Sequence, residues 1–331
     1  MDISHKAYAR AGLIGNPSDG YNGKTIAFTV KDFHAEVQLR QSERLEFIAG
    51  PSDSNCFTSL ISLHSDITEH GYYGGIRLVK AAIKVFVDYC LTHEIEIENK
   101  NFTIEYQTNI PQQVGMAGSS AIIIATLRCL MEFYNVEMNR RVQPSVALSA
   151  EIDELGIGGS LHDRVVQVYE GVVGMDFSQM EKVDGYDCGR YQPIDPDLLP
   201  PVYVAYRPES SEPTEVFHND LRARFDAGER KVVDAMKRFA ELTDQANEAL
   251  LNSDRIALSS LLDANFDCRQ SFCNLNPQHT EMVKQARQVG VSAKYAGSGG
   301  AVIGIYHNES QFEELQCAMN QIGCRVIKPM L

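Results

Sequence analysis

The chain has 331 residues, 44% of them hydrophobic and 22% charged, so it can bury a sizeable core, and two domains are expected. Its 30 basic and 44 acidic side chains give a net charge of −14 without a long basic run, which argues against nucleic acid or an anionic membrane as the main partner. An anionic small molecule is not excluded, because a local cluster of donors can overcome an acidic average.

The start of the chain and its cysteines are typical of a cytoplasmic protein. The segment MDISHKAYAR lacks an apolar signal core, and no run approaches the ~20 apolar residues of a membrane span. The eight cysteines form no C-x-x-C pair, and the two closest, Cys268 and Cys273, have no nearby pair of histidines. We therefore expect free thiols in a reducing compartment rather than a zinc site. The sequence leaves monomer and homodimer open.

Strand and helix patterns are interleaved in the N-terminal part. Apolar residues with a period of two predict strands at 8–14, 25–40 and 102–109. Apolar residues at helical spacing predict helices at 74–91, 119–134 and 144–155. The second strand is expected to contain a turn or bulge near Lys31 and Asp32.

A proline-rich stretch at 193–201 precedes the C-terminal part. Strands are predicted there at 202–207, 301–306 and 324–329. Helices are predicted at 229–252, 254–273, 278–289 and 309–322. Because the order of elements lacks a regular βαβ period, the sequence predicts an α+β protein with domains at 1–195 and 196–331.

The most informative segment is PQQVGMAGSSA at 111–121, between a predicted strand and a predicted helix. A glycine-rich loop that leads into a helix presents unpaired N–H groups and a positive dipole end to an anion. Serine hydroxyls at this point can cap the helix, bind phosphate or ligate Mg²⁺. The alternative is an ordinary capped helix after a tight turn. A second segment, Gly23-Lys24-Thr25, is rejected as a P-loop, because a strand pattern follows it and Ser18 occupies the position of the first glycine.

This loop resembles the second signature of the GHMP kinases (galactokinase, homoserine kinase, mevalonate kinase and phosphomevalonate kinase), P-x-x-x-G-L-G-S-S-A. Residues 9–19 are similar to the N-terminal motif of that superfamily, and residues 294–301 are similar to its C-terminal glycine motif. The resemblance implies a ribosomal-protein-S5-like N-terminal domain and a ferredoxin-like α/β C-terminal domain. The stretches GNPSDGYNGKTI, GYYGGIRLVKA and LGIGGSLHDRV are similar to the glucuronokinase family, which transfers the γ-phosphoryl group of ATP to the anomeric hydroxyl of glucuronate. Met116-Ala117 departs from the usual Leu-Gly or Leu-Ser.

The resemblance implies roles for residues that match its motifs. Asp163 would be the general base for the sugar hydroxyl, with Arg10 beside it to favour the ionised carboxylate and stabilise charge in the transition state. Glu151 would ligate Mg²⁺, with Asp153 and Glu154 as nearby rivals, together with a serine, taken as Ser120 although Ser119 is a rival. The phosphates of ATP would be held by Pro111, Gly115, Met116, Ala117, Gly118, Ser119, Ser120 and Ala121.

The sugar site is inferred partly from the resemblance and partly from residue type. Asp19 matches the sugar-binding acid of the N-terminal motif. Backbone close to the substrate and triphosphate is expected at Gly297, Gly299 and Gly300. Aromatic stacking on the sugar is expected from Tyr21 and Tyr72, and a partner for a uronic acid carboxylate from Lys24 or Arg77. Two alternatives stay open, namely another acceptor (galacturonate, galactose or a heptose) and a catalytically silent homologue that binds sugar and ATP to regulate a partner.

Overall fold

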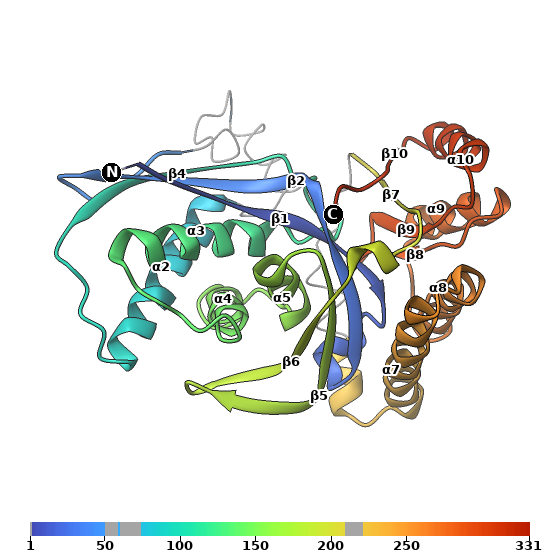
Figure 1. Ribbon diagram of the computed structural model, residues 1–331, viewed down its shortest axis with the longest axis horizontal. Helices are drawn as coiled ribbons and strands as arrows, with labels where there is room; N and C mark the ends of the chain where they lie inside the picture. Colours follow the sequence, from blue (N-terminus) through green and yellow to red (C-terminus); the bar gives the residue numbers. More distant parts are fainter. Residues whose placement is uncertain (1, 50–58, 60–73, 209–220) are drawn as a thin grey trace.

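The computed structural model describes residues 2–49, 59, 74–208 and 221–331. A long, curved sheet covers a layer of four helices, and a smaller sheet with its own helices lies at one end of it (Figure 1). Both sheets are almost entirely antiparallel. The α+β class expected from the sequence is therefore confirmed.

The larger sheet has six strands. In chain order they are β1 (Asp2–Ile14), β2 (Lys24–Ser42), β3 (Glu46–Phe47), β4 (Asn101–Thr108), β5 (Val172–Val183) and β6 (Tyr186–Ile194). The order in space is β3-β4-β2-β5-β6, with β1 also paired to β2. The pairing of β1 with β2 skips residues 31–33, which confirms the bulge expected near Lys31 and Asp32. Met330 closes this bulge, because its carbonyl accepts from the Lys31 N–H and its N–H donates to the Asp32 carboxylate.

The hairpin of β5 and β6 was missing from the predicted elements. Its turn places Asp184 and Gly185 at φ values of 48° and 85°. Positive φ at both central residues is the geometry of a two-residue hairpin loop, for which Asp-Gly is a preferred pair. The dipeptide was therefore a usable signal in the sequence.

Four helices pack under the larger sheet: α2 (Gly75–Thr92), α3 (Gly118–Tyr134), α4 (Gln143–Ile152) and α5 (Leu161–Tyr169). Helix α3 is central and contacts β1, β2, α2, α4 and α5. Its residues Ile122, Ile123 and Ile124 are all buried, which explains why β-branched residues occupy consecutive helical positions. This burial holds the start of α3 in a fixed place beside β1.

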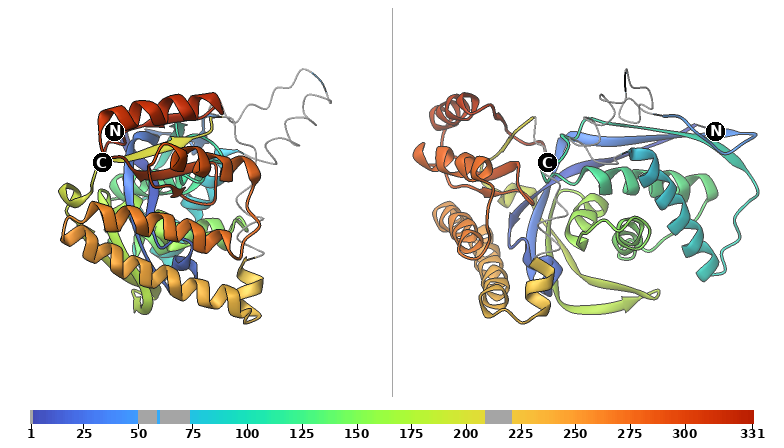
Figure 2. Two further views of the ribbon diagram at one scale, coloured as in Figure 1. Left: turned by 90° about the vertical axis from the view of Figure 1, so that its right-hand side faces the viewer. Right: turned by 180° about the vertical axis from the view of Figure 1, so that it is seen from behind.

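The smaller sheet has the order β10-β7-β9-β8. Its strands are β7 (Val202–Tyr206), β8 (Lys294–Tyr295), β9 (Ala301–Ile305) and β10 (Arg325–Ile327). The helices of this part include α7 (Arg230–Leu251), α8 (Arg255–Gln270), α9 (Pro277–Gln288) and α10 (Glu309–Gln321), and residues 221–226 before α7 are also helical. Helices α7 and α8 run side by side and contact β1 (Figure 2). None of the helices within the described ranges is both long and apolar enough to span a membrane.

One hydrophobic core joins the two sheets. Val204 of β7 and Leu242 of α7 belong to the same buried cluster as Leu13 of β1. A domain division between residues 195 and 196 stays a prediction, and the surfaces on either side of it are packed together.

Candidate active site

A cavity of about 470 Å³ lies where the two sheets meet. Its walls come from segments far apart in the chain, namely β1, the 3₁₀ helix η1 (Ser18–Tyr21), and residues 110–119, 156–164 and 297–298. The cavity therefore collects all three glycine-containing motifs that the sequence analysis singled out.

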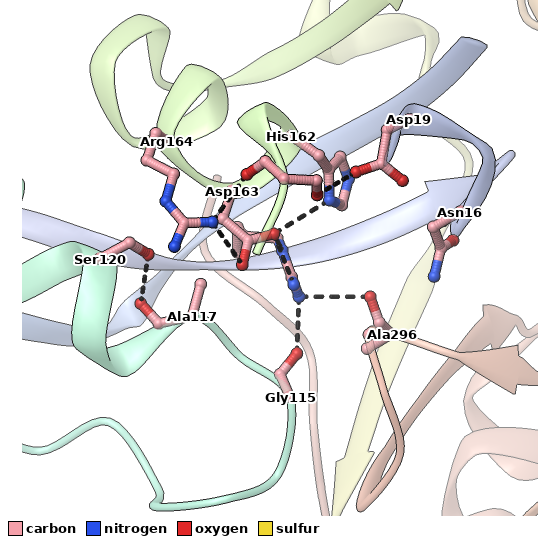
Figure 3. A network of polar contacts seen from close by, with 12 residues as sticks. Asn16, Asp19, Gly115, Ala117, Ser120, His162, Asp163, Arg164 and Ala296 are labelled. Atoms are coloured by element: carbon pink, nitrogen blue, oxygen red, sulfur yellow. Dashed lines mark hydrogen bonds and ion pairs between the residues drawn. The ribbon is translucent and has the colours of Figure 1, made fainter. Parts of the chain in front are cut away.

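Arg10 ties three of these segments together. It projects from β1 and is 6% exposed. Its Nε donates to Asp163 Oδ1 at 2.7 Å, and its Nη1 donates to the carbonyls of Gly115 at 2.6 Å and Ala296 at 3.3 Å. Asp163, Gly115 and Ala296 come together at this point of the site (Figure 3), where Arg10 donates to all three. One side chain thus fixes α5, the first glycine loop and the second glycine loop relative to one another.

Asp163 lies in the first turn of α5, whose N-terminal position also favours a negative charge. Burial alone would raise the pKa of this carboxyl, but the charge of Arg10, the contact with His162 and the charge of Arg164 hold its pKa well below the usual range. The carboxylate is therefore ionised at any ordinary pH. His162 Nδ1 lies 3.1 Å from Asp163 Oδ1, and His162 Nε2 is buried without a hydrogen-bond partner in the described structure.

The start of α3 faces the cavity without a side-chain cap. Ala117 precedes the helix with φ of 64°, a conformation that costs a non-glycine residue about 1–2 kcal/mol. Two donors hold it there, since the Ala117 carbonyl accepts from Gln167 Nε2 at 2.8 Å and from Ser120 Oγ at 3.2 Å. The first N–H groups of α3 have no acceptor within the helix, so this end can bind an anion.

The two glycine loops touch. Gly115 has φ of 68°, and a Cβ atom added to Gly297 would lie 2.2 Å from the Gly115 carbonyl oxygen. Arg269 secures the second loop by donating to the carbonyls of Gly297 at 2.7 Å and Ser298 at 2.9 Å. A side chain at either glycine would push the loops apart and reshape the cavity.

Glu151 lines the cavity, is only 1% exposed and forms an ion pair with Arg164. One of its oxygens accepts from Ser119 Oγ at 2.7 Å, and the other is bound by Arg164 Nη2. Arg164 also donates to the Ser160 carbonyl at 2.7 Å and is only 3% exposed. The carboxylate and the Ser119 hydroxyl are hard oxygen ligands of the kind that Mg²⁺ prefers, so these residues fit a metal bound partly by protein and partly by phosphates.

Asp19 and Tyr21 of η1 form another part of the cavity wall. Asp19 accepts a hydrogen bond from Ser160 Oγ. Burial raises the pKa of Tyr21 to about 12, so its phenol is neutral. Its ring lies 4.8 Å from the ring of Phe225 and under the guanidinium of Arg222, which is 4.5 Å from the ring centroid. Tyr21 therefore supports Arg222 as well as lining the cavity.

Comparison with known proteins identifies this arrangement. The model of the GHMP kinases N terminal domain matches residues 77–171, and that of the GHMP kinases C terminal matches residues 246–323. Glucuronokinase 1 of Arabidopsis thaliana is 44% identical over 307 residues, which cover 91% of this chain and 84% of that protein. The chain belongs to the GHMP kinase family. It is accordingly a phosphotransferase with an alcohol group as acceptor, and its phosphoryl donor is ATP.

Solved structures show that this GHMP kinase has the fold of the family. Lactococcus lactis galactokinase complexed with galactose superposes with a TM-score of 0.79 at 14% identity, covering 100% of this chain and 93% of that one. Methanococcus jannaschii mevalonate kinase superposes with a TM-score of 0.73 at 19% identity, covering 100% and 99%. The two-domain fold expected from the sequence is confirmed.

The structure brings most of the expected site residues of this GHMP kinase to the cavity wall. Those lining it are Arg10, Asp19, Tyr21, Pro111, Gly115, Met116, Ala117, Gly118, Ser119, Glu151, Asp163 and Gly297. Gly299 and Gly300 do not line it, and a Cβ atom on Gly299 would lie 2.5 Å from His279 Nδ1. Gly299 is therefore packed against His279 and not exposed in the cavity wall.

Other expected residues lie elsewhere. Ser120 is fully buried and its hydroxyl is used on Ala117, so Ser119 is the serine that meets Glu151, in contrast to the expectation. Lys24 is bound to both oxygens of Asp244 at 2.9 Å, outside the cavity. Two further expected residues, Ala121 and Arg77, are not part of the wall. Tyr72 falls outside the described residues.

Four cationic residues at or beside the site were not predicted as site residues from the sequence. Arg164 pairs with Glu151, and Arg269 and Arg222 also line the cavity. Lys294 braces the second glycine loop from inside, because its Nζ donates at 2.7 Å to the carbonyls of Gly12 and Tyr295 and to Asn16 Oδ1. Arg164 was detectable as the neighbour of Asp163, and Arg269 lies in the stretch DANFDCRQSF, which is similar to the glucuronokinase family, whereas Arg222 carries no motif that marks it.

Proposed function

We propose that this GHMP kinase is a glucuronokinase, which transfers the γ-phosphoryl group of ATP to the anomeric hydroxyl of D-glucuronate and releases D-glucuronate 1-phosphate and ADP. Two Arabidopsis thaliana proteins, named glucuronokinase 1 and probable glucuronokinase 2, are 44% and 43% identical over 91% of the chain. Relatives named for mevalonate or galactose are 20–22% identical. The geometric support is the ionised Asp163, held by Arg10 beside the uncapped start of α3.

The triphosphate is expected to lie against the loop at 115–119 and the N-terminus of α3. The free N–H groups and the helix dipole would bind its oxygens, and Gly115 and Gly118 in the wall would let the phosphates approach the main chain closely. Ser119 and Glu151 would hold Mg²⁺, with phosphate oxygens and water as its other ligands. The metal would offset the charge of the β- and γ-phosphoryl oxygens.

Asp163 would orient the acceptor hydroxyl for in-line attack. Its low pKa makes it a weak base, so it suits a loose transition state in which the proton leaves the oxygen late. As the new O–P bond forms and the bond between the β- and γ-phosphoryl groups breaks, the hydroxyl proton passes to the carboxylate and then to solvent. Arg10 would stabilise the negative charge that develops between Asp163 and the transferred group.

A panel of sugars with ATP and Mg²⁺, scored by ADP release, tests the proposal. D-Glucuronate is expected to give the highest kcat/KM among glucuronate, galacturonate, galactose, glucose and a heptose. A product that carries phosphate on the anomeric oxygen, seen by ³¹P NMR, would identify the acceptor atom. Turnover of galactose or a heptose above glucuronate would contradict the proposal, and no turnover of any sugar would favour a catalytically silent homologue.

The serine that binds the metal can be identified with two matched variants. Ser119→Ala is expected to raise the Mg²⁺ concentration needed for half-maximal activity about 10- to 100-fold. The variant loses the hydroxyl that would ligate the metal and that donates to Glu151. Ser120→Ala, which removes only the bond to Ala117, should change the Mg²⁺ requirement far less. A Mg²⁺ titration of activity at saturating ATP measures both, and the reverse ranking would assign the metal to Ser120.

A further inference from the structure

In the described part of the chain, four arginines line the cavity, and three of them are bound to carboxylates or main-chain carbonyls of the site. Arg10 is paired with Asp163, and Arg164 is paired with Glu151. Arg269 donates through both terminal nitrogens to main-chain carbonyls. All three are at most 6% exposed. Their positive charges or donors are thus used to build the site itself.

Arg222 differs from these three in its surroundings. It lies within helical residues 221–226, and its side chain is 51% exposed. Within the described residues, Arg222 Nη1 forms an ion pair with Asp226 at 3.9 Å, and its Nη2 donates to the Gly20 carbonyl. Of the arginines that line the cavity, Arg222 has the longest ion pair in the part of the chain that the structure describes, and there its Nε and Nη1 donate no hydrogen bond shorter than that 3.9 Å contact.

The position of Arg222 is nevertheless fixed. Leu221 and Phe225 of the same helical residues pack into a buried cluster with Tyr21. The Arg222 guanidinium stacks over the Tyr21 ring at 4.5 Å, an arrangement that holds its plane while leaving the edge free. A preorganised guanidinium of this kind binds a carboxylate with two parallel hydrogen bonds.

Arg222 also lies beside the sugar-binding side of the cavity. Gly20 sits between it and Ser160, because a Cβ atom on Gly20 would be 3.7 Å from Arg222 Nη2 and 3.8 Å from Ser160 Cβ. Ser160 in turn donates to Asp19. A sugar whose hydroxyls are bound by Asp19 would therefore present another substituent to Arg222 across Gly20.

We infer that Arg222 binds the carboxylate of a uronic acid and gives this kinase its preference for uronates over neutral sugars. The inference rests on the proposed glucuronokinase function and adds the residue that recognises the acid group. It replaces Lys24, which is neutralised by Asp244 outside the cavity. A neutral hexose carries a hydroxymethyl group at this position and would leave the guanidinium without its partner.

The test compares D-glucuronate with D-glucuronamide, which differs only in having a neutral amide in place of the carboxylate. The unchanged enzyme is expected to favour glucuronate by about 10- to 100-fold in kcat/KM, the range for hydrogen bonds to a charged group. Arg222→Gln should lower kcat/KM for glucuronate by about the same factor, mostly through KM, while leaving glucuronamide within about twofold. Arg222→Lys should restore only part of the preference, because it keeps the charge without the planar pair of donors.

Arg230→Gln is the matched control, since this exposed arginine at the start of α7 lies outside the cavity wall. It should keep the full preference for glucuronate. If the unchanged enzyme prefers glucuronate and Arg222→Gln retains that preference, the assignment of Arg222 is wrong and the proposed function stands. If the unchanged enzyme does not phosphorylate glucuronate, the proposed function fails and the Arg222 inference fails with it.

Discussion

Replacement of Asp163 by asparagine is expected to lower kcat about 10²- to 10⁴-fold while ATP binding stays within a fewfold of the original. Asparagine keeps the shape of the side chain but cannot take up the proton of the acceptor hydroxyl. ATP would contact the loop at 115–119 and the start of α3, which Asp163 reaches only through Arg10. Steady-state ADP release gives kcat, and titration with a non-hydrolysable ATP analogue gives the nucleotide affinity.

Asp153→Asn serves as the control, because Asp153 is an exposed acid just after α4 and makes the same change of charge. It should leave kcat unchanged. If the Asp163→Asn enzyme keeps the original kcat, Asp163 is not the general base. A thermal unfolding curve must accompany the assay, because Arg10 loses its charged partner in this variant.

The pH dependence of kcat gives a second test of the role assigned to Asp163. The pKa of Asp163 is held well below the ordinary value near 4, so the carboxylate stays ionised down to acidic pH. We expect no acidic limb in kcat from this residue between pH 5 and 8. Because the folded pKa is lowered, its contribution to stability is fully present above about pH 4 and is lost as the pH falls through the folded pKa. A limb near pH 6 that vanishes in Asp163→Asn would contradict the low pKa.

Arg164→Met is expected to destabilise the fold by about 3–5 kcal/mol, because it leaves the Glu151 carboxylate buried without its cation. Glu151 is 1% exposed, so water cannot easily replace the guanidinium. The Ser119 hydroxyl would remain as a donor, and one neutral hydrogen bond is too weak to offset the burial of a charge. Urea unfolding followed by circular dichroism measures the loss, provided that the transition is cooperative.

A double variant separates the charge effect from simple loss of packing. Adding Glu151→Gln to Arg164→Met removes the unpaired charge and should recover most of the lost stability, whereas activity should remain low because a metal ligand is missing. If the double variant is as unstable as the sum of the single variants, the two side chains act independently. The buried ion pair would then contribute little to folding.

Features that depend on neighbouring residues could be predicted from the sequence, whereas features that depend on residues far apart in the chain could not. Helix α3 was predicted because its apolar pattern and the glycine loop before it are local features. The choice between Ser119 and Ser120 was not, since adjacent helical residues point about 100° apart and the direction depends on the left-handed conformation of Ala117. That conformation is held by Gln167, which lies 50 positions further along the chain.

The cationic side chains show the same limit. Arg10 and Asp163 were expected to lie side by side because both belong to motifs, and the structure shows that contact across 153 positions. Arg222 and Arg269 reach the cavity only because helical residues 221–226 pack on Tyr21 and α8 packs against the second glycine loop. Lys24 was misplaced for a similar reason, because Asp244, its partner, lies on α7 and is invisible to a local pattern.

The continuous core between the sheets has a consequence for engineering within this family. Val204, Leu242 and Leu13 meet at a packed seam, so the two halves of the chain are fitted to each other and not only linked. A chimaera that joins the first half of this kinase to the second half of a relative would have to match the seam side chain by side chain. Substrate preference in such hybrids would therefore be read reliably only after the seam had been repacked.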